Sequence, residues 1–287
     1  MLMGEEPAGS FRGEKMQMNK IGVMQGRLTD KGGFFPQIFP FQNWKQEFVV
    51  ASKIGFDSIE WMFNDEDWSN NPIMLDNGIN ELNQLMNETG VSVNSICANY
   101  FMKHCIYSLD SDEIACTEKV LDKLISNAVK IQCANIIIPM FEESELLHMN
   151  SMTVNVIGHF LNKIEQSHIR ILIETDMEAK ALKSHIHRYN SDSVGVCFDL
   201  GNITGIGRNL QTEIDELGSL IKNVHIKDKK VSGTTVMLGE GDVNFAQCLS
   251  QLSSAGYDGN YILESFYGTE AINDTIRNYE FLKGVLV

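Results

Sequence analysis

The chain has 287 residues and carries 23 Lys and Arg against 38 Asp and Glu, a formal net charge of −15 at pH 7. Its hydrophobic content of 43% is typical of a globular protein and excludes a disordered chain. The acidic balance argues against a nucleic-acid partner, and the lack of any apolar run of roughly 18 residues argues against a membrane span.

The first 18 residues differ in character from the rest of the chain. They are polar and lack the apolar core of a secretory signal. We expect residues 1–18 to form a short, flexible polar tail, followed by one domain over residues 19–287. The six cysteines form no CxxC pair, which is typical of reduced thiols, so we expect a cytoplasmic location.

Short apolar runs alternate with amphipathic stretches through the whole of that domain. Nearly continuous apolar runs are typical of strands buried on both faces of a parallel sheet. They predict strands over 21–26, 56–62, 91–98, 135–140, 169–175, 194–200, 223–228 and 260–266. Helices are predicted over 42–54, 78–89, 112–131, 152–167, 177–189, 211–221, 244–255 and 271–284.

Eight strand–helix pairs in succession predict an α/β protein, a single (β/α)₈ TIM barrel. The alternative is an open doubly wound sheet. That fold usually carries a GxGxxG fingerprint after its first strand, and the sequence has none there. We therefore favour the closed barrel, whose active sites lie at the carboxyl ends of the strands.

Four consecutive predicted strands carry an acid or a histidine at that end. Glu174, Asp199 and Glu264 end the fifth, sixth and eighth runs, and His225 lies in the seventh. Each alone could be a helix cap or a hydrogen-bonded core residue. Together they would cost several kcal/mol to bury without compensation. One divalent cation would compensate all four, and this ligand set suits Mn²⁺, Co²⁺ or Mg²⁺, with Zn²⁺ left open.

The segments around these residues resemble the xylose-isomerase-like TIM-barrel superfamily, in particular its sugar (phosphate) isomerase and epimerase members. The resemblance covers roughly residues 19–285. It rests on IETD around Glu174, FDLGN around Asp199, HIKDK around His225, LGEG at 238–241 and ILES around Glu264. It implies that Glu174 and Glu264 both bind the metal and transfer protons, and that Asp199 and His225 are the other ligands.

The resemblance implies a metal-dependent sugar or sugar-phosphate isomerase or epimerase that works through a metal-stabilised enediolate. Such chemistry removes a proton beside a carbonyl, and a second acid returns one. Which glutamate is the base depends on the stereochemistry of the substrate. The alternatives are a metal-dependent lyase or dehydratase acting on a polyol, and a sugar-binding barrel without turnover.

The apurinic endonucleases of the same superfamily fit the sequence poorly. They hold three zinc ions with additional histidines, whereas this chain has Asn99 and Asn202 at two of those positions. We therefore expect a small-molecule sugar or sugar phosphate as the partner, and no DNA.

Several other residues near the strand ends are candidates for substrate contact. The set comprises Arg27, Glu60, Trp61, Asn99, Asn202 and Lys227. Arg27 could bind a phosphate or carboxylate, or form a loop salt bridge. Trp61 could contact a sugar face, or pack in the core. Asp228 could orient a metal ligand from behind.

Two loops complete the set of candidates. The aromatic loop over residues 34–44 could cover the pocket or form a contact in a homo-oligomer, and the sequence favours neither. Gly239 and Gly241 predict a turn before the next helix, where a phosphate could also bind.

Overall fold

The computed structural model of the chain describes residues 20–29, 38–104, 106, 111–141 and 151–286. The expected tail, residues 1–18, lies outside these residues, as do residues 34–37 of the aromatic loop.

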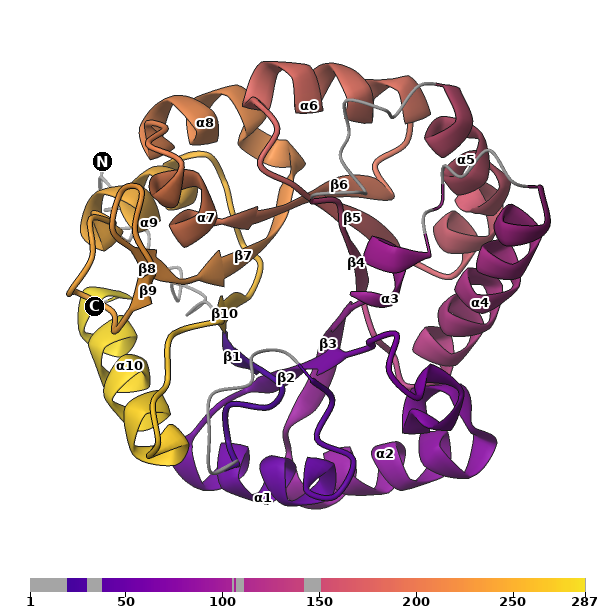
Figure 1. Cartoon of the computed structure of the whole chain (residues 1–287), viewed down its shortest axis with the longest axis horizontal. Helices are drawn as coiled ribbons and strands as arrows, with labels where there is room; N and C mark the ends of the chain where they lie inside the picture. Colours follow the sequence, from indigo (N-terminus) through magenta and orange to yellow (C-terminus); the bar gives the residue numbers. More distant parts are fainter. Residues whose placement is uncertain (1–19, 30–37, 105, 107–110, 142–150, 287) are drawn as a thin grey trace, which may run out of the picture.

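Eight parallel strands close into a barrel (Figure 1), in the order β1-β10-β7-β6-β5-β4-β3-β2. Their bounds are β1 (Ile21–Met24), β2 (Ser58–Met62), β3 (Ser92–Cys97), β4 (Asn135–Pro139), β5 (Arg170–Glu174), β6 (Val194–Asp199), β7 (Ile221–Ile226) and β10 (Tyr261–Leu263). β1 closes the ring, because Gly22 pairs with Ile262 on one side and with Ser58 on the other. The predicted (β/α)₈ barrel is confirmed.

Helices form a ring around the barrel (Figure 1). They are α1 (Trp44–Ile54), α2 (Asp76–Thr89), α4 (Ser111–Lys130), α5 (Ser151–Gln166), α6 (Ala179–Ile186), α8 (Leu210–Leu217), α9 (Phe245–Ser254) and α10 (Ala271–Leu286). Each corresponds to a predicted helix. α1 and α2 end at Gly55 and Gly90, whose φ angles of 104° and 72° are left-handed and favour glycine.

Short elements that the sequence pattern does not predict follow some of the strands. α3 (Tyr100–Lys103) follows β3, and α7 (Leu200–Gly205) follows β6. After β7 the chain forms a hairpin of β8 (Asp228–Lys229) and β9 (Thr235–Val236). All of them lie beyond the carboxyl ends of their strands, the end at which this fold places its active sites.

The described helices give no indication of a membrane span. None of them combines sufficient length with sufficient apolar character to cross a bilayer. The described cysteines are free thiols: Cys97, Cys133, Cys197 and Cys248 are buried and Cys116 is exposed.

Candidate metal centre

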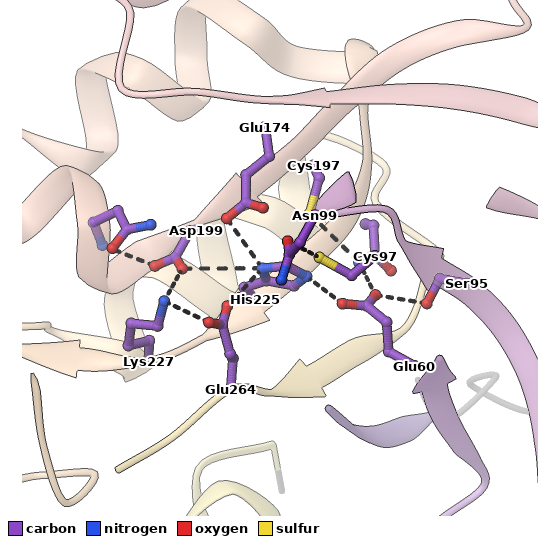
Figure 2. A network of polar contacts seen from close by, with 12 residues as sticks. Glu60, Ser95, Cys97, Asn99, Glu174, Cys197, Asp199, His225, Lys227 and Glu264 are labelled. Atoms are coloured by element: carbon purple, nitrogen blue, oxygen red, sulfur yellow. Dashed lines mark hydrogen bonds and ion pairs between the residues drawn. The ribbon is translucent and has the colours of Figure 1, made fainter. Parts of the chain in front are cut away.

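Four side chains converge at the carboxyl end of the barrel (Figure 2), and they are the four predicted ligands. Glu174, Asp199, His225 and Glu264 each offer one ligand atom, and these atoms lie within 4.8 Å of one another. His225 Nδ1 lies 2.9 Å from Glu264 Oε2, 3.3 Å from Glu174 Oε1 and 3.9 Å from Asp199 Oδ2. The strands β5, β6, β7 and β10 are neighbours in the barrel, which brings the four together.

The orientation of the imidazole is fixed from behind by Glu60. His225 Nε2 lies 2.7 Å from Glu60 Oε1, and both side chains are completely buried. The other oxygen, Glu60 Oε2, accepts hydrogen bonds from Ser95 Oγ at 2.6 Å and Asn223 Nδ2 at 3.0 Å. A proton on Nε2 leaves the lone pair on Nδ1, facing the three carboxylates. A carboxylate behind the imidazole is the usual arrangement at metal-binding histidines.

The charges of this cluster call for a cation. Four buried carboxylates and two buried basic side chains meet here: Glu60, Glu174, Asp199 and Glu264, and Lys227 and Arg27. With a neutral imidazole, the set carries two surplus negative charges. A buried surplus of this size is costly, and one divalent cation would balance it. Three carboxylates and an imidazole therefore fit a divalent ion in both donor chemistry and charge.

The carboxylates experience different surroundings. Burial raises the pKa of the Glu174 carboxyl, although the nearby His225 acts in the opposite direction. Burial acts on Glu264 in the same way, but Lys227 and His225 outweigh it and hold its pKa well below the usual range. Lys227 Nζ lies 2.8 Å from Asp199 Oδ2 and 2.9 Å from Glu264 Oε1. The two glutamates are therefore held in unequal electrostatic environments.

Cys197 lies close enough to form an alternative ligand set with Glu174 and His225. Burial raises the pKa of the Cys197 thiol to about 12. The set with Cys197 offers three ligands, whereas the set with Asp199 and Glu264 offers four. In the described part of the chain, both candidate sets share Glu174 and His225, so they define a single centre.

A cavity of about 440 Å³ opens beside the centre. Glu174, Glu264 and Lys227 line it, together with Asn99 and Asn202. This volume lies in the range of about 300–1,000 Å³ that is typical of small-molecule sites. The cavity is therefore of a size to hold a sugar against two of the carboxylates.

The sequence matches the model of a known family over residues 48–285, described as the xylose isomerase-like TIM barrel. The chain belongs to this family. L-Ribulose-5-phosphate 3-epimerase UlaE of Escherichia coli (strain SMS-3-5 / SECEC) is 26% identical over 240 residues, 79% of this chain and 83% of that protein.

Solved structures share the xylose isomerase-like fold. D-Psicose 3-epimerase superposes with a TM-score of 0.75 at 15% identity, over 93% of this chain and 99% of that one. L-Ribulose 3-epimerase gives 0.74 at 16% identity, over 94% and 95% of the two chains. For 3-keto-D-glucoside 4-epimerase YcjR of E. coli the score is 0.71 at 18% identity, over 93% and 99%.

In this xylose isomerase-like barrel, three of the predicted substrate residues line the cavity. Asn99 Oδ1 accepts a hydrogen bond from Cys97 Sγ at 3.2 Å. Asn202 and Lys227 line the cavity beside Asp199. Arg27 is buried behind Glu264, with Nη2 3.7 Å from Glu264 Oε1. Arg27 also donates to the Gln25 carbonyl oxygen at 3.4 Å and lies over the Tyr267 ring, so Glu264 is one of several described contacts, and its role in substrate binding stays a prediction.

Glu60 and Trp61 have contacts other than those expected of substrate-binding residues. Adjacent residues in a strand point to opposite faces, so the two side chains cannot both face the barrel interior. Glu60 points inward and its carboxylate is used by His225, Ser95 and Asn223. Trp61 points outward, is fully buried, and donates its indole N–H to Asn71 Oδ1 at 3.0 Å. The structure therefore gives Glu60 a supporting position and Trp61 a core position.

Asp228 does not contact the ligands, contrary to the expectation that it would orient one. Its Oδ2 accepts backbone N–H groups from Gly239 and Gly241, both at 2.9 Å, and its Oδ1 accepts that of Val243 at 3.2 Å. The turn considered as a phosphate seat is therefore filled by the carboxylate of Asp228. A Cβ at Gly241 would lie 2.1 Å from Asp228 Oδ1, which explains the glycine there.

The described part of the aromatic loop packs against the outer layer. The Phe39 ring packs against Trp61 at a tilt, with ring centroids 4.9 Å apart, and the Trp44 ring meets Trp61 edge-on, with centroids 5.5 Å apart. Residues 38–44 thus bury an aromatic cluster against β2. The expectation of a lid or of an oligomer contact concerns the loop as a whole, and it stays a prediction.

Proposed function

We propose that this chain is a divalent-metal-dependent sugar epimerase. The observation that carries the proposal is the convergence of Glu174, Asp199, His225 and Glu264 within 4.8 Å. Two of these carboxylates also line the cavity. The family membership and the relatives named as 3-epimerases support the same reaction class. Mn²⁺, Co²⁺ and Mg²⁺ suit the oxygen-rich ligand set best, and Zn²⁺ remains an alternative.

Glu174 and Glu264 are the proposed proton-transfer groups. They reach the cavity from β5 and from the end of β10, with β6 and β7 between them. A sugar bound between them would offer one glutamate the proton beside its carbonyl, and the other would return a proton on the opposite face. The bound cation would supply the positive charge that stabilises the enediolate.

The remaining residues of the centre hold these two groups in place. Lys227 contacts both Asp199 and Glu264, and Arg27 lies behind Glu264. Asp199 Oδ1 accepts the backbone N–H of Asn202 at 2.8 Å, which leaves its other oxygen for the centre. Groups fixed in this way need little rearrangement in the transition state.

The partner in this proposal is a small-molecule sugar or sugar phosphate, and the location is cytoplasmic, in keeping with the free thiols of the described cysteines. Assembly into a homo-oligomer stays a prediction.

Metal content per chain tests the proposal first. We expect about one divalent ion per chain in protein purified without chelator, and a clear loss in E264Q after reloading with Mn²⁺. Ketoses and their phosphates are then screened for deuterium uptake from solvent at the carbon beside the carbonyl. Absence of any bound ion after addition of Mn²⁺, Co²⁺ or Zn²⁺ would contradict the proposal. A product that lacks water would instead indicate a dehydratase.

A further inference from the structure

A second lysine lines the cavity without belonging to the metal centre. Lys229 lies in β8, two residues after Lys227, and both line the cavity. Successive side chains of an extended segment point to opposite sides. Lys227 and Lys229 therefore share the cavity side, and Asp228 points away. Lys227 is paired with Asp199 and Glu264, so Lys229 is the residue whose role is unexplained.

The helix α7 has two glycines, Gly201 and Gly205, where the side chains of Lys227 and Lys229 pack against it. A Cβ at Gly201 would lie 2.7 Å from Lys227 Cγ, and a Cβ at Gly205 would lie 3.0 Å from Lys229 Cδ. Residues four apart lie on one face of a helix. The two glycines thus form a bare face on which the two aliphatic stems lie. Larger side chains at either position would push a lysine off this face.

The ammonium group of Lys229 has a neutral partner. It donates to Asn202 Oδ1 at 2.8 Å, and no described carboxylate lies within ion-pair distance of it. Asp176 lines the same cavity but forms no ion pair with Lys229 in the described structure. An ammonium has three donors, so two remain for a ligand or for water. Lys229 therefore brings a positive charge to the cavity that no described carboxylate balances directly.

We propose that Lys229 binds an anionic group at the end of the sugar that lies away from the reacting carbons. This inference rests on the proposed function and names its substrate class, a ketose with a terminal phosphate or carboxylate. A chain with a net charge of −15 repels anions, so an anionic substrate needs a local cation of this kind. Asn202 links the two sites, because its backbone N–H binds Asp199 and its side chain binds Lys229.

Titration calorimetry on the full chain loaded with Mn²⁺ tests the proposal. The probes are L-ribulose 5-phosphate, L-ribulose and the ketose acid D-tagaturonate. We expect one of the charged probes to bind about 10- to 100-fold more tightly than L-ribulose, since a charge-assisted contact contributes this much. K229Q should remove that preference without weakening L-ribulose, and K229R should retain it. The probe that is preferred identifies the group as phosphate or as carboxylate.

The neighbouring Lys230 provides a matched control. It is exposed and absent from the cavity wall, so K230Q removes the same charge from the same segment and should leave the preference intact. Thermal melting of each variant checks that it folds. Equal or absent binding of the charged probes overturns the proposal, as does equal weakening of all three probes by K229Q.

Deuterium exchange on the same samples separates this inference from the proposed function. A preference that depends on Lys229, without exchange, contradicts the reaction and leaves the anion site standing. Exchange without any preference contradicts the anion site and leaves the reaction standing.

Discussion

Two buried histidines lie in different regions of the molecule: His225 in the barrel interior and His185 in the helical layer. Burial alone would lower the pKa of His225, but Cys197 and the carboxylates of Glu60 and Glu174 raise it well above the usual value. Among the described residues, no acid raises the pKa of His185 in α6 in this way. Burial lowers its pKa to about 4, and the nearby Arg188 adds to this. Its Nε2 lies 3.2 Å from the Tyr189 hydroxyl, a neutral partner.

The comparison separates the effect of burial from the effect of surplus negative charge. In the helical layer the protein keeps a buried histidine neutral. In the barrel interior it surrounds a fully buried histidine with acids, an arrangement that favours a positive charge there. Substitutions in the barrel interior, in the helical layer and in the turn held by Asp228 test this difference, from the largest expected effect to the smallest.

Removing one carboxylate from the barrel interior should have the largest effect. In E264Q, and likewise in E174Q, we expect turnover of an identified substrate to fall by about 10³-fold or more, because one proton-transfer group and one metal ligand are lost together. Deuterium exchange measures turnover, and circular dichroism checks the fold. Near-native turnover in either variant would show that the two-glutamate mechanism is wrong.

The helical layer should show its own dependence on pH. His185 has a folded pKa of about 4, below its usual 6.5. The unfolded chain therefore binds the proton first, and stability is lost as the pH falls from 6.5 to 4. The loss from this one group should reach about 3 kcal/mol. Urea unfolding at several pH values should show a smaller decline in H185Q than in the wild type, and parallel curves would contradict the assignment.

Altering the support behind the imidazole should weaken metal binding without removing a ligand. In E60Q we expect the affinity for Mn²⁺ to fall about 10- to 100-fold, because the amide holds the Nε2 proton less strongly than the carboxylate does. Calorimetric titration with Mn²⁺ measures this. The control is W61F, which changes the next residue on the opposite face of β2. Unchanged affinity in E60Q would mean that Glu60 serves only to fill the barrel.

Asp228 offers the smallest and most local effect. In D228N we expect a loss of stability of about 1 kcal/mol, because a neutral amide oxygen replaces the charged acceptor of three backbone N–H groups. Mn²⁺ affinity should stay within about twofold of wild type, since Asp228 contacts none of the four ligands and distant sites act independently. A drop in affinity as large as that in E60Q would restore the original expectation for Asp228.

Most of the barrel could be predicted because its strands are nearly continuous apolar runs such as NIIIP in β4, which are typical of a sheet covered on both faces. The four converging ligands could be predicted because consecutive strand ends are neighbours in any closed barrel. The short elements α7 and β8 were missed, since six and two residues are too few to show a period.

The sequence suggested Asp228 as the residue that orients a metal ligand, but Glu60 lies behind His225 instead. The reason for this difference is the distance along the chain. Glu60 reaches His225 across the barrel from a strand 165 residues away in sequence, and no local pattern encodes that contact. One signal was available. Strand alternation places Ser58 and Glu60 on one face of β2 and Trp61 on the other. The same alternation after His225 puts Lys227 on the ligand side and Asp228 on the opposite side.

That alternation constrains how this stretch of the chain can vary. From His225 to Lys229, each residue on the cavity side is followed by one that faces away. Deleting or inserting a single residue here would exchange Lys227 and Asp228, which would add a fifth carboxylate to the acids and leave the turn at 239–243 without its anchor. The length of the segment 225–229 is therefore fixed by the side chains it places on its two faces. Changes of length are expected in the turn over 230–234, between β8 and β9, where Val231 is 52% exposed.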